Sequence, residues 1–272
     1  MASAGWVSSL AAWLRSSPPR SPQPRAITLM SLQQKTAVVT GGGTGIGLAI
    51  ARALAQEGCQ VAIAGRREET LQDAVEAYRG DPPMRFHPVD VADRESVNRL
   101  FQWAEKALGP IDILVNSAGM NVRDRTLAQM KPEEWDRVLA VNATGAFNCM
   151  YAVLPQMRAR QSGIIINISS IAGKRAAPLG GVAYNASKFA MSALGMSAWL
   201  EEAKNNIRVT NIYPGEVNTP ILDHRPVPVS EEHKTSILQP EDVASMVLAV
   251  IKLPPRAHVP ELIIKPTLQD YV

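Results

Sequence analysis

The sequence predicts an α/β protein built as one domain, with a doubly wound parallel sheet of about seven strands and helices on both faces. Two observations support this prediction. From Lys35 onward, short runs rich in β-branched residues alternate with longer segments of helical periodicity. Several of the short runs are almost wholly apolar, among them AVVT, VAIA and IIINI. Such runs are typical of strands that helices cover on both sides.

The expected elements follow one another along the chain without an internal repeat. Strands are expected at residues 36–40, 60–64, 84–89, 112–116, 163–169, 208–213 and 262–265. Helices are expected at residues 45–57, 68–78, 93–108, 132–158, 184–205 and 242–252. Asp93 and the Pro240-Glu241-Asp242 stretch are typical of helix starts. Ligands of such sheets bind at the carboxyl ends of the strands, so residues just after each strand are the functional candidates.

Composition and charge exclude several classes of protein. Apolar residues make up 46% of the 272 residues and charged residues 19%, which excludes wholesale disorder. Residues 1–29 hold three of the 28 basic residues and no acid, so the remaining 25 basic residues equal the 25 acidic ones. A neutral body argues against nucleic-acid binding. No apolar run approaches the roughly 20 residues that span a membrane. Two cysteines fit a reducing compartment, and the four histidines lack metal-ligand spacing, so no metal is expected.

The N-terminal segment differs in composition from the rest. Residues 1–29 contain six serines and four prolines, a density that prevents a continuous helix. One interpretation is a disordered tail or an upstream start codon, since Met30 precedes the first strand. The other is an organellar transit peptide, which is Arg-rich, Ser-rich and acid-free. We therefore predict residues 1–32 as a disordered tail or targeting segment. The cytoplasm is the expected location, and an organelle is the alternative if the segment is a transit peptide.

A glycine-rich turn follows the first strand directly: Thr40-Gly41-Gly42-Gly43-Thr44-Gly45-Ile46-Gly47. Glycines at this place allow a tight turn and let backbone N–H groups approach a pyrophosphate at a helix N-terminus. The spacing differs from the common G-x-G-x-x-G, and a plain strand–helix connection is the alternative. Strand, glycines and helix in this order favour a dinucleotide site.

The end of the second strand indicates which dinucleotide binds. A site that prefers NAD usually carries an acid there for the ribose 2′-OH. This chain has Ala64-Gly65-Arg66-Arg67 instead. Arg66 and Arg67 can pair with a 2′-phosphate, and no carboxylate repels it. The sequence therefore favours NADP over NAD, although both arginines could also be ordinary solvated residues at a helix start.

A tyrosine and a lysine are spaced one helical turn apart in Tyr184-Asn185-Ala186-Ser187-Lys188. A phenol with a pKa near 10 is a poor base at neutral pH, but a neighbouring ammonium lowers that pKa. Tyr184 is therefore a candidate general acid/base. The pattern alone is common by chance. Four further motifs accompany it: Asn116-Ser-Ala-Gly119, Asn142, Asn167-Ile-Ser-Ser170, and Pro214-Gly215-Glu-Val217-Asn-Thr219.

This set, in this order and spacing, resembles the short-chain dehydrogenases/reductases over about residues 33–268. The resemblance implies a Rossmann-like catalytic domain over residues 33–272. It implies that Tyr184 exchanges a proton with the substrate oxygen and that Ser170, rather than Ser169, hydrogen-bonds that oxygen. Lys188 would bind the nicotinamide ribose and lower the pKa of Tyr184, and Asn142 would hold a water of a proton relay.

The resemblance also implies a set of cofactor-binding positions, with Asp90 reaching the adenine. They are Gly41, Gly45, Ile46, Gly47, Arg66, Arg67, Asp90, Val91, Asn116, Ala118, Gly119, Tyr184, Lys188, Pro214, Gly215, Val217 and Thr219. The chain departs from the family at Ser117, where a second Asn is usual, and at Thr44, where many NADP-preferring members have a basic residue. The second departure leaves Arg66 and Arg67 to recognise the phosphate.

The resemblance implies hydride transfer between NADP and a small alcohol or carbonyl compound, and a homotetramer or homodimer. The Gly65-Arg-Arg-Glu-Glu-Thr-Leu stretch and the C-terminal residues 257–267 are similar to NADP-dependent 3-hydroxy-acid (serine-type) dehydrogenases. A carbonyl or keto-steroid reductase stays open, as does a non-catalytic NADP-binding regulator. An epimerase or dehydratase of the extended relatives is disfavoured, because those normally carry a longer substrate domain.

Overall fold

Seven parallel strands form one sheet in the order β3-β2-β1-β4-β5-β6-β7 in the computed structural model, which describes residues 28–269. This confirms the predicted fold class. The strands are β1 Thr36–Thr40, β2 Gln60–Gly65, β3 Arg85–Pro88, β4 Ile113–Asn116, β5 Gly163–Ile168, β6 Ile207–Pro214 and β7 Glu261–Ile264. The order reverses between β1 and β4, which creates the switch point where such sheets bind ligands.

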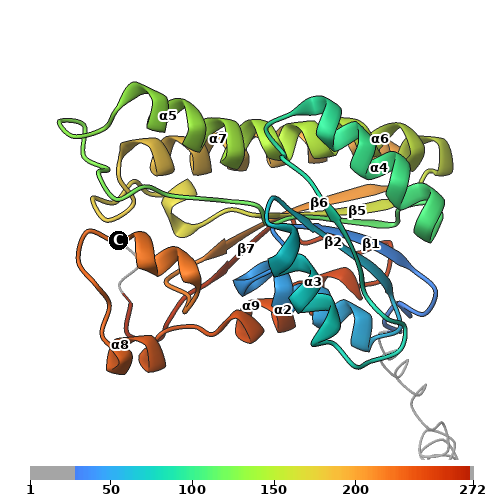
Figure 1. The fold of residues 1–272 in the computed structure, drawn as a ribbon. Helices are drawn as coiled ribbons and strands as arrows, with labels where there is room; N and C mark the ends of the chain where they lie inside the picture. The colour runs from blue at the N-terminus through green and yellow to red at the C-terminus, as the bar shows by residue number, and fades with distance from the viewer. Residues whose placement is uncertain (1–27, 270–272) are drawn as a thin grey trace, which may run out of the picture.

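Helices cover both faces of the sheet, as Figure 1 shows. The helices are α2 Gly45–Gln56, α3 Glu68–Glu76, α4 Arg94–Leu108, α5 Pro132–Leu139, α6 Gly145–Arg160, α7 Val182–Glu202, α8 Glu231–Ser236 and α9 Pro240–Ile251. Helices α2, α3 and α9 pack on one face, around Ile50, Leu71 and Val247. Helices α4, α6 and α7 pack on the other, around Leu100 and Val153. Apolar strands between two helical layers explain the unbroken hydrophobic runs in the sequence.

The fold begins earlier than the expected boundary at residue 33. Leu32 is buried in the core formed with α2 and α9. The backbone N–H of Met30 donates to the carbonyl of Lys252 at 2.7 Å. Residues 28–32 thus belong to the described body. The predicted tail or targeting segment otherwise lies outside the described residues.

The expected helix 132–158 is two helices joined by a π-helical turn at Ala140–Thr144. Helical periodicity is nearly the same on both sides of such a turn, so the sequence pattern does not reveal it. By length and composition the whole stretch Pro132–Arg160 is apolar enough to cross a membrane. Half of its most apolar window is buried inside the protein, as is usual for a core helix.

The segment between β6 and α9 contains helices that the sequence pattern did not predict. Residues Pro220–His224 form a 3-10 helix, and α8 follows with Ser230 as its N-cap. Both elements are short and largely exposed, so they have no long amphipathic pattern. We call residues 219–239 the flap.

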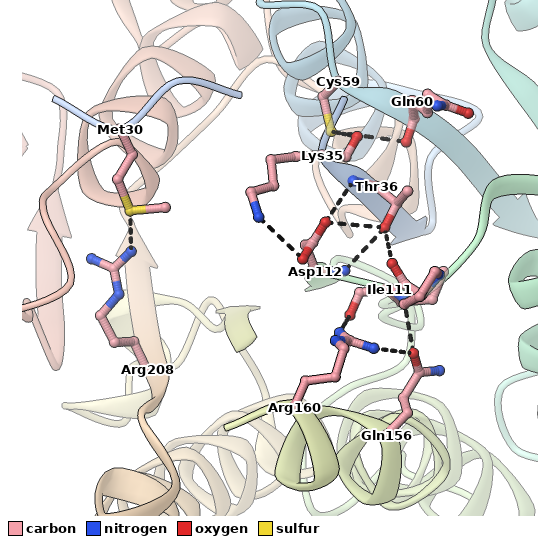
Figure 2. A network of polar contacts seen from close by, with 11 residues as sticks. Met30, Lys35, Thr36, Cys59, Gln60, Ile111, Asp112, Gln156, Arg160 and Arg208 are labelled. Atoms are coloured by element: carbon pink, nitrogen blue, oxygen red, sulfur yellow. Dashed lines mark hydrogen bonds and ion pairs between the residues drawn. The ribbon is translucent and has the colours of Figure 1, made fainter. Parts of the chain in front are cut away.

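The edge of the sheet at which the strands begin is held by a polar network around Asp112, shown in Figure 2. The Asp112 carboxylate accepts hydrogen bonds from the Thr36 backbone N–H at 3.2 Å and from Lys35 Nζ at 3.4 Å. Arg160 donates to the Ile111 carbonyl at 2.6 Å, and Gln156 accepts from the Ile111 N–H at 2.8 Å. These bonds join the starts of β1 and β4 to α6. They lie at the end of the sheet opposite to the carboxyl ends of the strands.

Candidate active site

A cleft of about 1040 Å³ runs along the carboxyl ends of the strands. Every predicted catalytic or cofactor-binding residue lines it except Asn116 and Asn142. Residues from stretches far apart in the chain meet there, including the glycine-rich turn, the end of β5 and the start of α7. The topology therefore brings the sequence motifs together at one site, as the switch-point rule predicts.

The glycine-rich turn has the geometry of a phosphate cradle. Gly41 has φ +65°, and a Cβ there would lie 2.7 Å from the Ser117 carbonyl oxygen. A Cβ on Gly47 would overlap the carbonyl of Gly41. Only glycine fits these two positions, because β1, the turn and α2 approach so closely. Thr44, the N-cap of α2, makes no side-chain cap hydrogen bond, and the first turn of α2 has no acid. An anion such as a pyrophosphate fits these uncapped N–H groups.

The end of β2 is positively charged and open to solvent. Arg66 and Arg67 are exposed and line the cleft beside Gly43. Asp90, which follows β3, is also exposed and lines the cleft. Its carboxylate accepts from the Ala92 N–H at 3.0 Å, which fixes its direction. The residues present fit a dinucleotide whose adenosine end carries an additional phosphate.

The two neighbouring serines at the end of β5 have different surroundings. Ser170 lines the cleft, forms a side-chain hydrogen bond with Tyr184, and accepts from the Ala172 N–H at 3.1 Å. The Ser169 hydroxyl is buried, donating to the Lys188 carbonyl at 3.2 Å and contacting Ser192 Oγ at 3.1 Å. The assignment of Ser170 to the reacting centre thus agrees with the geometry, while Ser169 ties β5 to α7.

The groups around Tyr184 shift the pKa of its phenol in opposite directions. Burial raises the pKa of the phenol, whereas the hydrogen bond from Ser170 and the charge of Arg125 lower it, and the net direction is upward. The Lys188 ammonium lies 5.6 Å from the centre of the Tyr184 ring but donates to the Ile168 carbonyl at 2.8 Å. Burial also lowers the pKa of Lys188 to about 8. The lowering of the Tyr184 pKa by Lys188 stays a prediction.

Asn142 lies behind the cleft in the π-helical turn and is fully buried. Its amide donates to the Met120 carbonyl and to Ser187 Oγ, both at 2.9 Å, and its oxygen accepts from the Met120 N–H at 2.8 Å. Both N–H groups of the Asn142 side chain are thus used, while its oxygen accepts one hydrogen bond and keeps a second lone pair. The side chain fixes the segment after β4 against α7, and the water of the proton relay stays a prediction.

Asn116 also lies outside the cleft, because its amide belongs to a row of side chains that crosses the sheet. It donates to Asn167 Oδ1 at 2.9 Å, and Asn167 donates to Asn211 Oδ1 at 3.1 Å. The three asparagines are paired residues of β4, β5 and β6. Asn211 continues the row to the Ser192 carbonyl of α7. The row supports the floor of the site, and the cofactor contact of Asn116 stays a prediction.

The cleft is also lined by residues that sequence reasoning did not select, among them Asn121, Arg125, Glu216 and Gln269. Asn121 donates to the Gly180 carbonyl at 3.0 Å, and Gln269 accepts from the Glu216 N–H at 2.9 Å. The Glu216 carboxylate pairs with Arg225 at 2.7 Å and His233 at 2.8 Å. These residues lie in loops without a periodic pattern, so only the tertiary contacts reveal them. Within residues 28–269, no cluster of three or more His, Cys, Asp or Glu side chains is arranged to hold a metal.

A doubly wound sheet, a glycine-rich anion cradle and a Ser170–Tyr184–Lys188 centre in one cleft define a dinucleotide-dependent oxidoreductase as the class of protein. Residues 35–227 match the short chain dehydrogenase family, and the chain belongs to this family of oxidoreductases.

Similar proteins agree with this assignment. The chain is 36% identical over 236 residues to an uncharacterized oxidoreductase of Staphylococcus aureus, covering 86% of this chain and 98% of that protein. It is 36% identical over 260 residues to a glycine betaine reductase of Emericella nidulans, covering 93% of this chain but spanning only 20% of that protein's length. A serine dehydrogenase in its closed form, complexed with NADP+, superposes with a TM-score of 0.80. That structure is 30% identical and covers 87% of this chain and 96% of its own.

Proposed function

We propose that this protein is an NADP-dependent oxidoreductase that transfers a hydride between the nicotinamide and a small alcohol or carbonyl substrate. The observation that supports this most is the meeting of Ser170, Tyr184 and Lys188 in the cleft that also contains the glycine-rich turn. NADP, when bound, supplies or accepts the hydride. The chain's own residues then handle the proton.

The Tyr184 hydroxyl donates its proton to the carbonyl oxygen during reduction and accepts the alcohol proton during oxidation. Ser170, which already bonds the Tyr184 hydroxyl, holds the same substrate oxygen and orients it. Lys188 lies one turn further along α7, where it contacts the ribose and adds positive charge below its pKa of about 8. Asn142 holds Met120 and Ser187 in place beside this centre.

Arg66 and Arg67 are the residues that select NADP, since a 2′-phosphate at the end of β2 meets two guanidinium groups and no carboxylate. NAD is the less favoured cofactor for the same reason. The NADP+ complex of the similar serine dehydrogenase supports this choice.

The substrate is a small hydroxy acid in this proposal. The substrate half of the cleft contains Arg125, Arg175 and Arg225, against the acids Glu216 and Asp223. Glu216 is already paired with Arg225. The excess of positive charge suits a carboxylate next to the reacting carbon. The similarity to a serine dehydrogenase points to the same class.

A panel of hydroxy acids, simple ketones and keto-steroids, followed by NADPH absorbance, tests the substrate class. We expect the best kcat/KM with a 3-hydroxy acid or its keto form. A preference for uncharged ketones or keto-steroids would establish the carbonyl-reductase alternative. NADP binding without turnover of any compound would instead favour a regulator. We further propose a cytoplasmic location and a homotetrameric or homodimeric assembly.

A further inference from the structure

Arg125 is a buried charge that takes no part in the proton transfer described above. The described residues contain three buried charged side chains: Arg125, Lys188 and Glu202. Glu202 is paired with Arg158. Within residues 28–269, neither Arg125 nor Lys188 has an acidic group within ion-pair distance, although burying an unpaired charge is costly. Lys188 belongs to the proposed catalytic centre, so Arg125 is the buried cation whose contacts are still to be explained.

The Arg125 side chain joins the segments that surround the substrate half of the cleft. Its Nε donates to the Val122 carbonyl at 3.0 Å, within its own loop between β4 and α5. Its Nη1 donates to the Leu179 carbonyl at 2.8 Å, in the loop that leads into α7. Its Nη2 donates to the carbonyl of His224 in the flap. One guanidinium thus connects three segments that are far apart in the sequence.

The backbone around Arg125 shows that this arrangement is tightly packed. The Val182 N–H, at the first residue of α7, donates to the Arg125 carbonyl at 3.0 Å. Gly181 has φ +77°, and a Cβ there would overlap the Arg125 side chain. The main chain of Arg125 is therefore bound at Val182, two residues before Tyr184, and its side chain packs against Gly181. Only a planar fork of N–H donors reaches three carbonyls in different directions.

The charge of Arg125 also acts on Tyr184. The charged and polar groups that face the phenol are Ser170 after β5, Lys188 from α7 and Arg125 from the segment before α5. Arg225 in the flap faces Arg125 and is paired with Glu216. Alcohol oxidation is favoured at high pH, where Lys188, with a pKa of about 8, loses its charge. Arg125 keeps its charge over this whole range.

We propose that Arg125 is a positioning residue of the active site, which fastens the flap over the substrate and keeps a permanent positive charge beside Tyr184. This inference rests on the proposed function for its effect on turnover. Its two effects have separable structural origins: the three-way fork holds the flap, and the charge stabilises the phenolate. A lysine supplies the charge without the fork, and a methionine supplies neither.

The test compares wild type with Arg125→Lys and Arg125→Met, and uses Lys131→Met as the control, since Lys131 is exposed in the same connection between β4 and α5. Hydrogen–deuterium exchange of residues 219–239 measures how firmly the flap is held. The pKa of Tyr184 is measured by ultraviolet absorbance, as the difference between each protein and its Tyr184→Phe counterpart. KM and kcat are then measured for the best substrate.

We expect both Arg125 variants to exchange faster in the flap and to have a higher KM. Arg125→Met should also raise the Tyr184 pKa by about one unit, and Arg125→Lys should restore it. Unchanged flap exchange in both variants, or an unchanged Tyr184 pKa in Arg125→Met, would overturn the proposal. If Arg125→Met does not fold, the same judgement rests on Arg125→Lys, which must loosen the flap and keep the pKa. Exchange and absorbance need no turnover, so an inactive wild type would count against the proposed function alone.

Discussion

At the scale of single residues, chemically identical side chains have different contacts and therefore different roles. Ser169 and Ser170 are neighbours in the chain, yet one bonds Lys188 and Ser192 in the interior and the other bonds Tyr184 in the cleft. Arg125 and Arg123 differ in the same way, one buried and one exposed. The contacts of each side chain, rather than its type, determine what its removal does.

Tyr184→Phe keeps the aromatic ring and its packing but deletes the proposed proton donor. We expect kcat to fall by about 10²- to 10⁴-fold, the usual contribution of general acid–base catalysis. NADPH affinity should stay close to that of wild type. Steady-state turnover and fluorescence titration with NADPH measure the two quantities. Near-normal turnover in this variant would refute the assignment of Tyr184.

Ser170→Ala and Ser169→Ala form a matched pair. Ser170→Ala removes the hydroxyl that bonds Tyr184, so kcat should fall while thermal stability changes little. Ser169→Ala removes buried hydrogen bonds to Lys188 and Ser192, so it should cost about 1 kcal/mol of unfolding free energy and affect kcat much less. Urea denaturation and turnover of both variants distinguish these outcomes. A larger loss of kcat in Ser169→Ala would reverse the assignment.

Arg66→Asp replaces a cation at the end of β2 with the carboxylate that suits an unphosphorylated ribose. Loss of a charge-assisted contact costs about 1.5–3 kcal/mol, which corresponds to a drop in NADP affinity of roughly ten- to a hundredfold. Affinity for NAD should be unchanged or higher. Calorimetric titration of wild type and variant with both cofactors measures the shift. A wild type that already prefers NAD would contradict the role given to Arg66.

At the scale of elements, helix α7 has to approach β6 closely in order to place Tyr184 and Lys188. Gly195 makes this possible, because a Cβ there would overlap the Asn211 side-chain amide. Asn211 is the end of the asparagine row that crosses β4, β5 and β6. The same row therefore sets the depth of α7 and supports the floor of the cleft.

Gly195→Ala should destabilise the protein by about 1–3 kcal/mol, since overpacking against Asn211 outweighs the helix propensity gained by alanine. Ser197→Ala, exposed on the same helix, is the control and should change stability by less than about 0.5 kcal/mol. Chemical denaturation of both variants provides the comparison. A stabilised Gly195→Ala protein would mean that α7 does not need this close approach.

The elements show how far the sequence pattern predicts the fold. All seven strands were expected within two residues of their observed ends, because apolar strands covered on both sides have a strong local pattern. The π-helical turn at Ala140–Thr144 and the helices of the flap were not expected. A π-turn preserves helical periodicity, and the flap helices are too short to have a periodicity of their own.

At the scale of the whole molecule, the face formed by α6 and α7 exposes more large apolar side chains than is usual for a monomer. Tyr151 on α6 is 70% exposed and Leu200 on α7 is 68% exposed, and Phe147, Phe189 and Met196 are partly exposed on the same two helices. Met191 and Ala198 of α7 are part of the interior. Helices α6 and α7 lie in the same outer layer in Figure 1.

We predict that a second copy of the chain covers this face in a homotetramer or homodimer. Light scattering should give a mass of two or four chains at micromolar concentration. Tyr151→Glu combined with Leu200→Glu should shift the mass toward the monomer, because the two carboxylates would be desolvated at the interface. The control, Leu268→Glu, alters an exposed apolar side chain outside α6 and α7 and should leave the mass unchanged. A monomeric wild type would contradict the prediction.

By itself, the sequence determined the alternation of strands and helices and the place of the glycine-rich turn, and it predicted Ser170, Tyr184 and Lys188 as the catalytic residues. These features depend on local periodicity and on short spacings, which the chain carries along its length. The tertiary structure alone decided what surrounds them: that both N–H groups of the Asn142 side chain donate to Met120 and Ser187, that Lys188 donates to the Ile168 carbonyl, and that Arg125 joins three loops. Burial and charge at a site depend on groups that are distant in sequence, so they exist only after the chain has folded.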